Sequence, residues 1–162
     1  MQWLVVLKLL AVLAIANGTP VFMKTVLRDR FAWAVDGGAR FFDGQRLFGP
    51  SKTIRGVIGS ILVTSACAPV FGLPTRVGLI VGALAMAGDL FSSFLKRRMA
   101  VPAGGKATVL DQVPESLFPL LACQHELSLT IVDTVVTVVL FFVIGMALSR
   151  LLYKLHLRER PY

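Results

Sequence analysis

Apolar residues dominate five long segments of the chain, and polar residues gather between them. In chain order the segments run from Trp3 to Phe22, Ile54 to Phe71, Val77 to Leu95, Val109 to Cys123 and Leu127 to Leu151. A bilayer core of about 30 Å is crossed by about 20 helical residues, so segments of this kind predict transmembrane helices. The fourth segment is the shortest and is interrupted by polar residues and prolines. The pattern therefore predicts an all-α integral membrane protein with five transmembrane helices, of which the fourth is short.

Composition supports a membrane protein with little mass outside the bilayer. Of the 162 residues, 56% are hydrophobic and 16% are charged, whereas soluble domains average about 45–50% apolar and about 25% charged residues. Soluble enzyme folds, disordered chains and disulfide scaffolds are therefore disfavoured. Cys67 and Cys123 lie in apolar segments without metal-ligand spacing, and we interpret them as buried thiols. We expect one transmembrane domain over residues 1–162.

Basic residues alternate between the connections. Residues 24–53, residues 96–108 and the C-terminal tail are rich in Lys and Arg, whereas the second connection carries only Arg76 and residues 124–126 carry none. Short cytoplasmic loops are enriched in Lys and Arg. The N-terminus should therefore lie outside and the C-terminus in the cytoplasm, as in a multi-pass protein of the cell (inner) membrane.

The first segment has one alternative reading, as a cleaved signal peptide. Ala14-Ile15-Ala16 resembles a signal-peptidase site. However, the region before the apolar stretch has no positive charge, and Lys8 interrupts the stretch. These features favour a retained first helix.

The net charge of +8 also depends on the membrane context. In a soluble protein it would suggest a nucleic-acid partner. Here we interpret it as topogenic charge, together with attraction to anionic lipid headgroups or to a phosphate-bearing substrate. No nucleic-acid partner is expected.

Three acidic residues fall in the same half of the predicted bundle. With the N-terminus outside, Asp89 lies near the cytoplasmic end of the third helix, and Asp111 and Glu115 lie in the cytoplasmic half of the fourth. An ionisable side chain at the centre of a span costs about 2.5–3.5 kcal/mol, and such residues usually line a cavity. This convergence predicts a polar site beside the two basic loops.

The third helix indicates what that site could bind. Asp89, Ser92 or Ser93, and Lys96 recur at a spacing that places them on one helix face. Magnesium is typically held by one or two carboxylates together with substrate phosphates. Asp89 and Asp111 from neighbouring helices would supply such a pair.

The first basic loop, residues 24–53, has the composition of a phosphate-binding loop. Its last part reads Asp43-Gly44-Gln45-Arg46-Leu47-Phe48-Gly49-Pro50-Ser51-Lys52-Thr53-Ile54-Arg55-Gly56, so glycines, hydroxyls and cations alternate ahead of a helix N-terminus. Such a loop can present backbone N–H groups to phosphate. It is not a Walker motif, because Lys52 comes two residues late and no strand precedes the loop. A phosphate-rich ligand at a cytoplasmic membrane site is predicted.

These residues, taken in order, resemble one known family. The blocks are Asn17-Gly18-Thr19-Pro20, Asp43 to Gly49 with Lys52-Thr53-Ile54-Arg55-Gly56, Gly88-Asp89 with Ser93-Phe94-Leu95-Lys96-Arg97-Arg98, and Leu110-Asp111-Gln112. Together they resemble the CDP-archaeol synthase family and its bacterial relatives, which are related to CDP-diglyceride synthetases. The resemblance covers residues 16 to 121 in matching order, which makes it more specific than any single block.

The resemblance implies a reaction, a cofactor and a set of site residues. CMP would pass from CTP to a lipid phosphate, such as phosphatidic acid or an ether-lipid analogue, giving a CDP-lipid and pyrophosphate with Mg²⁺ as cofactor. Asp89 and Asp111 would hold the metal, and Lys96 and Arg97 would neutralise phosphate charge. The substrate-binding set would be Asn17, Asp43, Arg46, Gly49, Lys52, Thr53, Arg55, Ser93 and Gln112.

One position departs from the family pattern. Archaeal members carry an acidic residue three positions after the aspartate of the Asp-Gln pair, where this chain has Pro114, followed by Glu115. Metal ligation by Glu115 therefore stays open. The lipid tail and the number of metal ions also stay open, and the sequence is compatible with a homo-oligomer.

Two other functions remain as alternatives. Asp36-Gly37-Gly38-Ala39-Arg40 is a near miss to the motif of CDP-alcohol phosphotransferases, but it is one residue short and the motif's later aspartates are missing. A non-catalytic membrane protein that binds or transports anionic lipids would also carry basic loops. Pyrophosphate released from CTP would support the cytidylyltransferase, and CMP released from a CDP-lipid would support the phosphotransferase.

Overall fold

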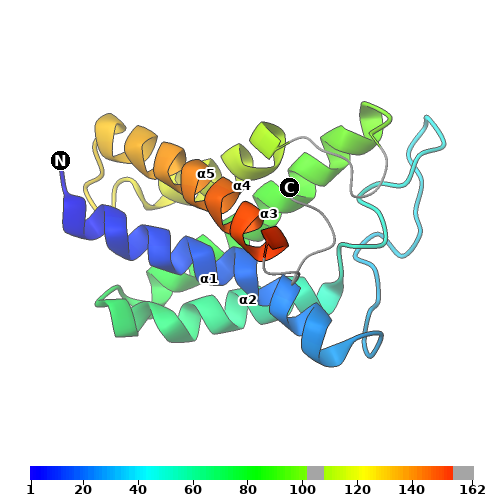
Figure 1. Ribbon diagram of the computed structural model, residues 1–162, viewed down its shortest axis with the longest axis horizontal. Coiled ribbons are helices and arrows are strands. Elements are labelled where there is room, and N and C mark those ends of the chain that lie inside the picture. Colours follow the sequence, from blue (N-terminus) through cyan, green and yellow to red (C-terminus); the bar gives the residue numbers. More distant parts are fainter. Residues whose placement is uncertain (102–107, 155–162) are drawn as a thin grey trace.

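The computed structural model describes residues 1–101 and 108–154, and it is all-helical (Figure 1). Five α-helices follow one another: α1 (Trp3–Leu27), α2 (Ile54–Cys67), α3 (Thr75–Arg98), α4 (Thr108–Cys123) and α5 (Ile131–Lys154), with the 3₁₀-helix η1 (Ala68–Phe71) extending α2. Within these described ranges the only β-type pairing is two isolated bridges in the α1–α2 loop. The predicted all-α class is confirmed.

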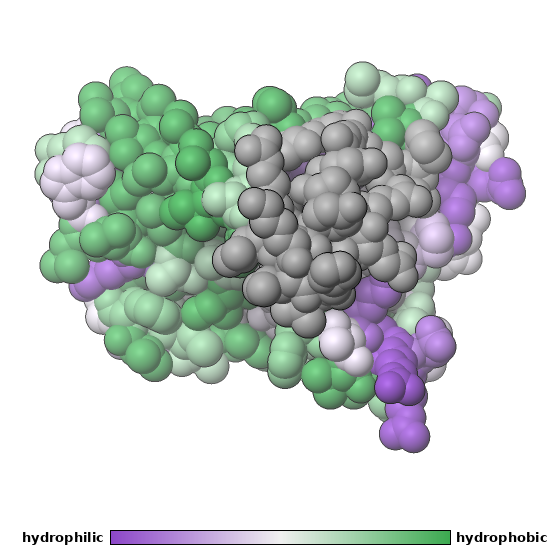
Figure 2. Space-filling model, viewed as in Figure 1, coloured by the Kyte–Doolittle hydropathy of each residue, from purple (hydrophilic) through white to green (hydrophobic). Residues whose placement is uncertain are grey.

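Four helical stretches are long and apolar enough to cross a membrane: Trp3–Leu27, Ile54–Phe71, Thr75–Arg98 and Ile131–Leu148. Helix α4 is short, as predicted, with 16 residues. Figure 2 shows hydrophobic side chains over the helical body and hydrophilic ones toward the end that carries the α1–α2 loop. The structure therefore has the surface of a multi-pass membrane protein.

The loop boundaries differ from the sequence-based expectation. Helix α1 continues to Leu27, so the first loop begins at Arg28 rather than at residue 24. Helix α3 continues through the basic residues to Arg98, so residues 96–98 of the loop expected over residues 96–108 belong to a helix. At the other end, α4 begins at Thr108. Residues 102–107 of that loop lie outside the described part of the chain.

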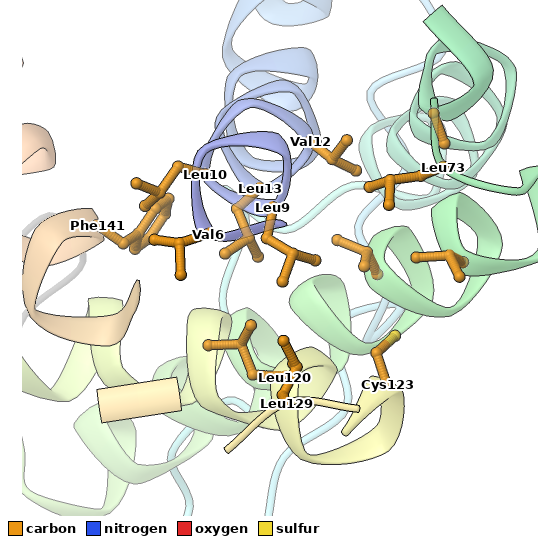
Figure 3. Packing of buried hydrophobic residues seen from close by; sticks show 13 residues of the cluster. Val6, Leu9, Leu10, Val12, Leu13, Leu73, Leu120, Cys123, Leu129 and Phe141 are labelled. Carbon is orange, nitrogen blue, oxygen red and sulfur yellow. The ribbon is translucent and has the colours of Figure 1, made fainter. Parts of the chain in front are cut away.

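The main apolar core fills the half of the bundle that lies away from the α1–α2 loop. Leu9 and Leu13 of α1 are fully buried there against Leu120 and Cys123 of α4 and Phe141 of α5 (Figure 3). The cluster toward the other end is much smaller and consists of Ala16, Ala85 and Met86 with Val57 packed against them. The half nearest the loop is therefore left to polar groups.

A proline in α1 sets the contact between α1 and α2. Pro20 has no N–H, so the carbonyl of Ala16, four residues earlier, loses its partner in the helix. The buried hydroxyl of Ser60 in α2 donates to that carbonyl at 2.6 Å. An unpaired carbonyl inside a bilayer costs several kcal/mol, so this bond stabilises the pairing of the two helices.

Small residues allow α3 to approach its neighbours closely. A Cβ added at Gly82 would lie 3.0 Å from the Cα of Ile61 in α2, and one added at Gly88 would lie 2.4 Å from the carbonyl oxygen of Pro114 in α4. Lipid tails are as apolar as side chains, so helix association in a membrane depends on such close packing. Helix α3 is thereby held between α2 and α4.

A capping box fixes the end of the bundle opposite the α1–α2 loop. Thr130 and Asp133 exchange hydrogen bonds at the start of α5: the Thr130 amide and hydroxyl donate to Asp133 Oδ2, and the Asp133 amide donates to Thr130 Oγ1. The amide of Gln2 also donates to Asp133 Oδ1 at 2.9 Å. The fully buried Asp133 carboxylate therefore joins the start of α1 to the start of α5.

Gly78→Ala should destabilise the protein, because the new Cβ would lie 2.6 Å from Ala68 Cβ, 2.7 Å from the Thr64 carbonyl oxygen and 2.9 Å from Ser65 Cα. Overpacking of this kind costs about 1–3 kcal/mol. The thermal midpoint of the purified protein in detergent should fall. Gly18→Ala is the matched control, since a Cβ there meets nothing within 4 Å; a midpoint for Gly78→Ala equal to that of Gly18→Ala would contradict the close packing.

Candidate functional site

A lysine from the first loop reaches an aspartate in α3. Lys52 Nζ lies 2.5 Å from both carboxylate oxygens of Asp89, and each side chain is about one-fifth exposed. Lys52 stands just before α2, and its neighbour Thr53 caps that helix by accepting a hydrogen bond from the Gly56 amide at 3.3 Å. The start of α2 thereby aims the Lys52 ammonium at α3.

A second lysine–carboxylate pair joins α3 to α4. Lys96 Nζ lies 2.6 Å from Asp111 Oδ1, and the lysine side chain is 12% exposed. That oxygen is buried and has no hydrogen bond of good geometry, so the contact is an ion pair only. Ser92, fully buried, donates to the Gly88 carbonyl at 2.8 Å and approaches the Asp111 carbonyl at 3.5 Å. Of the two serines considered from sequence, Ser92 therefore makes the α3–α4 contact.

A third acid completes the cluster. The Glu115 carboxyl lies near Asp89, with Lys52 and Asp111 also in its surroundings. The close approach at Gly88 explains this position, since the α4 backbone at Pro114 and Glu115 rests directly on that glycine. We define the charged cluster as Lys52, Asp89, Lys96, Asp111 and Glu115.

The charged cluster offers carboxylate oxygens to a divalent cation but not a complete set of protein ligands. In the described part of the chain no three His, Cys, Asp or Glu side chains are arranged to hold a metal by themselves. Mg²⁺ does not require such a cage, because it keeps several waters and is usually bound by one or two carboxylates and substrate phosphates. Asp111 Oδ1 lies 2.6 Å from Lys96 Nζ, so it would accept such an ion only in exchange for the lysine.

The α1–α2 loop is organised around one buried carboxylate, Asp36. Its side chain is fully buried, forms an ion pair with Arg46, and accepts from the amides of Gly38, Phe48 and Gly49 at 3.0, 3.2 and 2.9 Å. Gly49 adopts φ of +101°, which a glycine accommodates without strain. Burial alone would raise the pKa of Asp36, but the Arg46 guanidinium and the three amides hold that pKa well below its ordinary value.

Arg98 attaches this loop to α3. Its guanidinium lies over the rings of Phe41 and Phe94, 4.8 and 5.0 Å from their centroids, and is 3.1 Å from Asp43 Oδ1. It also donates to the Arg46 carbonyl at 2.9 Å. Arg98 is not among the site residues predicted from sequence. The sequence did contain a signal for this role, since three successive basic residues end α3 and the first loop is rich in aromatic residues.

Several residues predicted to bind substrate have other partners in the structure. Arg46 pairs with Asp36, and Arg55 donates to the backbone carbonyls of Arg28 and Arg30. Both guanidiniums therefore hold the loop.

Four further predicted residues are not part of the charged cluster as defined. Asn17 donates to the Leu13 carbonyl of its own helix at 3.1 Å, and the Gln112 amide lies against Gly145 of α5 with a buried Oε1 that has no hydrogen bond. Ser93 is 2% exposed. The Arg97 Nε is buried without a hydrogen bond among the described residues.

Known proteins resemble this chain over most of its length. A family model described as CarS-like CDP-archaeol synthase matches residues 68–162. The CDP-archaeol synthase of Pyrobaculum aerophilum is 34% identical over 91% of this chain and 92% of the relative, and that of Sulfurisphaera tokodaii is 30% identical over 91% and 89%. A solved structure of an intramembrane enzyme for archaeal membrane lipid biosynthesis is similar with a TM-score of 0.74 and 29% identity, covering 88% of this chain and 90% of that one.

Asp36→Asn should loosen the α1–α2 loop at neutral pH. Breaking a buried charge pair costs about 3 kcal/mol, and hydrogen-exchange protection of the Gly38 and Gly49 amides reports it. Because the folded-state pKa of Asp36 is lowered, its contribution is complete above the unfolded value of about 3.9 and is lost only as the pH falls through the folded-state pKa.

In the parent protein, protection of these amides should therefore be constant between about pH 5 and 8. Asp29→Asn, which removes an exposed carboxylate from the same loop, is the control. Equal protection in the two variants would contradict the assignment of Asp36 as the organising residue.

Proposed function

The chain belongs to the CDP-archaeol synthase family, and on that basis we propose that its charged cluster is where CMP passes from CTP to a lipid phosphate. The protein is a membrane cytidylyltransferase that forms a CDP-lipid. One observation supports this location of the reaction site. The charged cluster brings together two lysines and three acids from the first loop, α3 and α4, and it lies at the end of the bundle away from the main apolar core.

The reaction needs positioning and charge neutralisation. An oxygen of the lipid phosphate attacks the α-phosphorus of CTP, a new P–O bond forms, and the bond to the β-phosphate oxygen breaks to release pyrophosphate. No covalent protein intermediate is required. Bound Mg²⁺, held by Asp89 and Asp111, would neutralise phosphate charge at this centre. Lys52, Lys96 and Arg97 would bind the phosphate oxygens and offset the charge that develops on them.

The two ion pairs represent the site before substrate binds. Lys52 and Lys96 each neutralise an acid that would otherwise carry an unpaired charge within the bundle. With metal and triphosphate bound, the acids would hold the cation and the lysines would hold phosphate oxygens, so each of these side chains would again face an opposite charge. Glu115, close to Asp89, is a further candidate ligand.

The remaining predicted residues are assigned to shaping the site. Arg46, Thr53 and Arg55 hold the loop that presents Lys52. Asp43 does so through Arg98, and Gly49 through Asp36. Asn17, Ser93 and Gln112 lie on the surrounding helices, and we propose that their side chains line the pocket for the nucleotide.

The alternative as a CDP-alcohol phosphotransferase is disfavoured by the fold. The aspartate of its near-miss motif, Asp36, is fully buried in loop contacts and is not available to a substrate. The family of the relatives also favours transfer of CMP from CTP.

Asp89→Asn and Asp111→Asn should each abolish nearly all CMP transfer while the protein still inserts and folds. Each substitution removes the negative charge of a proposed metal ligand without changing the size of the side chain. The double variant should lose little more than either single variant, since both act through one metal–triphosphate unit. Glu115→Gln should lose about ten-fold, or roughly 1.4 kcal/mol. The measurement is pyrophosphate release and CDP-lipid formation over a Mg²⁺ titration at saturating CTP, with diacyl and dialkyl lipid phosphates.

Glu126→Gln is the control, because Glu126 sits between α4 and α5 and only approaches Arg76, at 3.8 Å. Near-parental turnover in Asp89→Asn with an unshifted Mg²⁺ midpoint would exclude Asp89 as a metal ligand. A product of CMP in place of pyrophosphate would exclude the cytidylyltransferase reaction.

Lys52→Ala and Arg55→Ala should differ in kind although they lie three residues apart. Lys52→Ala removes a proposed phosphate ligand, so the KM for CTP should rise at least ten-fold, about 1.4 kcal/mol or more. Arg55→Ala removes donors to the Arg28 and Arg30 carbonyls, so the thermal midpoint should fall with a smaller change in KM. An unchanged KM in Lys52→Ala would remove Lys52 from the nucleotide site.

The site should face the cytoplasm. In a background lacking Cys67 and Cys123, a cysteine at Phe42, which is fully exposed in the first loop, should stay unlabelled by a membrane-impermeant thiol reagent in intact cells and react after permeabilisation. A cysteine at His125 between α4 and α5 should react in intact cells. The reverse pattern would invert the orientation and place the proposed site on the outside.

A further inference from the structure

Arginines and aromatic rings crowd the turn that follows α1. Arg28 and Arg30 are exposed, and Phe31 and Trp33 are 64% and 69% exposed. The two rings pack edge to face with centroids 6.3 Å apart. Trp is enriched at the membrane–water interface, where its ring is half in the apolar phase and half hydrated. A paired Trp and Phe beside two arginines has that composition.

The turn is held in a defined shape. Arg55 from the start of α2 donates to the carbonyls of Arg28 and Arg30. Arg28 and Phe31 adopt φ of +45° and +55°, a conformation that non-glycine residues rarely adopt. Such backbone persists only where surrounding contacts enforce it. The backbone path of this turn is therefore set by the fold.

The two guanidiniums differ from other arginines near the loop. Arg46 and Arg98 are each paired with an aspartate, whereas among the described residues neither Arg28 nor Arg30 forms an ion pair. Together with Val26, Leu27 and Asp29 they line an open hollow of about 520 Å³. Two arginines against one aspartate leave the hollow with an excess positive charge.

The hollow adjoins an exposed apolar stretch of α1. Val21, Phe22 and Val26 on the last turns of α1 are 61%, 69% and 60% exposed, as expected of side chains in contact with lipid tails. Figure 2 shows hydrophilic side chains projecting at the end of the molecule where α1 finishes in Figure 1. A molecule in the hollow would thus have a phosphate-sized charge at the arginines and an apolar part along α1.

We propose that the turn over residues 26–33 is a docking site for the anionic headgroup of a membrane lipid, separate from the charged cluster. Arg28 and Arg30 bind the headgroup phosphate, the rings of Phe31 and Trp33 lie at headgroup level, and the acyl or alkyl chains follow the exposed face of α1. A lipid is favoured over free phosphate because its chains can contact the exposed apolar face and the aromatic pair, whereas a soluble anion would leave both without a contact. The site would hold the loop that carries Lys52 against the membrane surface.

Tryptophan fluorescence tests this directly, because Trp3 and Trp33 are the two tryptophans of the chain. The variant Trp3→Phe leaves Trp33 as the sole reporter. In phosphatidylcholine nanodiscs containing a minor fraction of phosphatidylglycerol, chain-brominated phosphatidylglycerol should quench Trp33 more than equally brominated phosphatidylcholine at the same fraction. Each arginine should contribute about five-fold enrichment of the anionic lipid, from the usual strength of a basic residue at an anionic surface.

In the same background, Arg28→Gln/Arg30→Gln should abolish the preference while Trp33 stays accessible to both lipids. Arg76→Gln, which changes an exposed arginine at the start of α3, should keep the preference. Equal quenching by the two lipids in the parent, or no quenching, would overturn the proposal. Loss of the preference on adding inorganic phosphate at constant ionic strength would assign the hollow to a soluble anion and would also overturn it. CMP-transfer activity, measured in parallel, is a separate readout, so failure of this proposal and failure of the proposed function are distinguishable.

Discussion

Charge neutralisation inside a membrane bundle is the constraint on which the rest of this structure depends. An acid in a bilayer-spanning helix is costly unless a partner compensates its charge. Here Lys52 pairs with Asp89 and Lys96 pairs with Asp111. The first pair ties the α1–α2 loop to α3, and the second ties α3 to α4. The interactions that compensate the charge of the acids therefore also assemble the proposed site.

Close helix packing makes this pairing possible. Gly88 brings the α4 backbone onto α3, which places Glu115 beside Asp89. Pro20 frees a carbonyl in α1 that Ser60 of α2 then satisfies. Prolines and glycines usually weaken a helix, but in a membrane they shape interfaces because neighbouring helices supply the missing partners. The polar cluster is thus supported by backbone contacts rather than by a large apolar core.

The α1–α2 loop is more ordered than its composition implies. Asp36 collects three amides and one guanidinium, and Arg98 fixes the same loop to α3 through Phe41, Phe94 and Asp43. These contacts hold the loop in the shape that brings the Lys52 ammonium to Asp89. They also separate two roles among basic residues of similar appearance, because Arg46 and Arg55 stabilise the loop whereas Lys52 reaches the acids.

The sequence by itself determined the helical class, the order of the helices, the short fourth helix and the shared depth of Asp89, Asp111 and Glu115. Those features follow from hydropathy, helix length and chain direction, which are local properties. The tertiary structure decided which lysine pairs with which acid, that the Ser92 hydroxyl approaches the α4 backbone, and that Arg46 pairs with Asp36. Membrane helices are apolar on nearly every face, so their pattern does not fix how each is rotated. Rotation is set by where small residues let two backbones meet, and only the assembled bundle shows that.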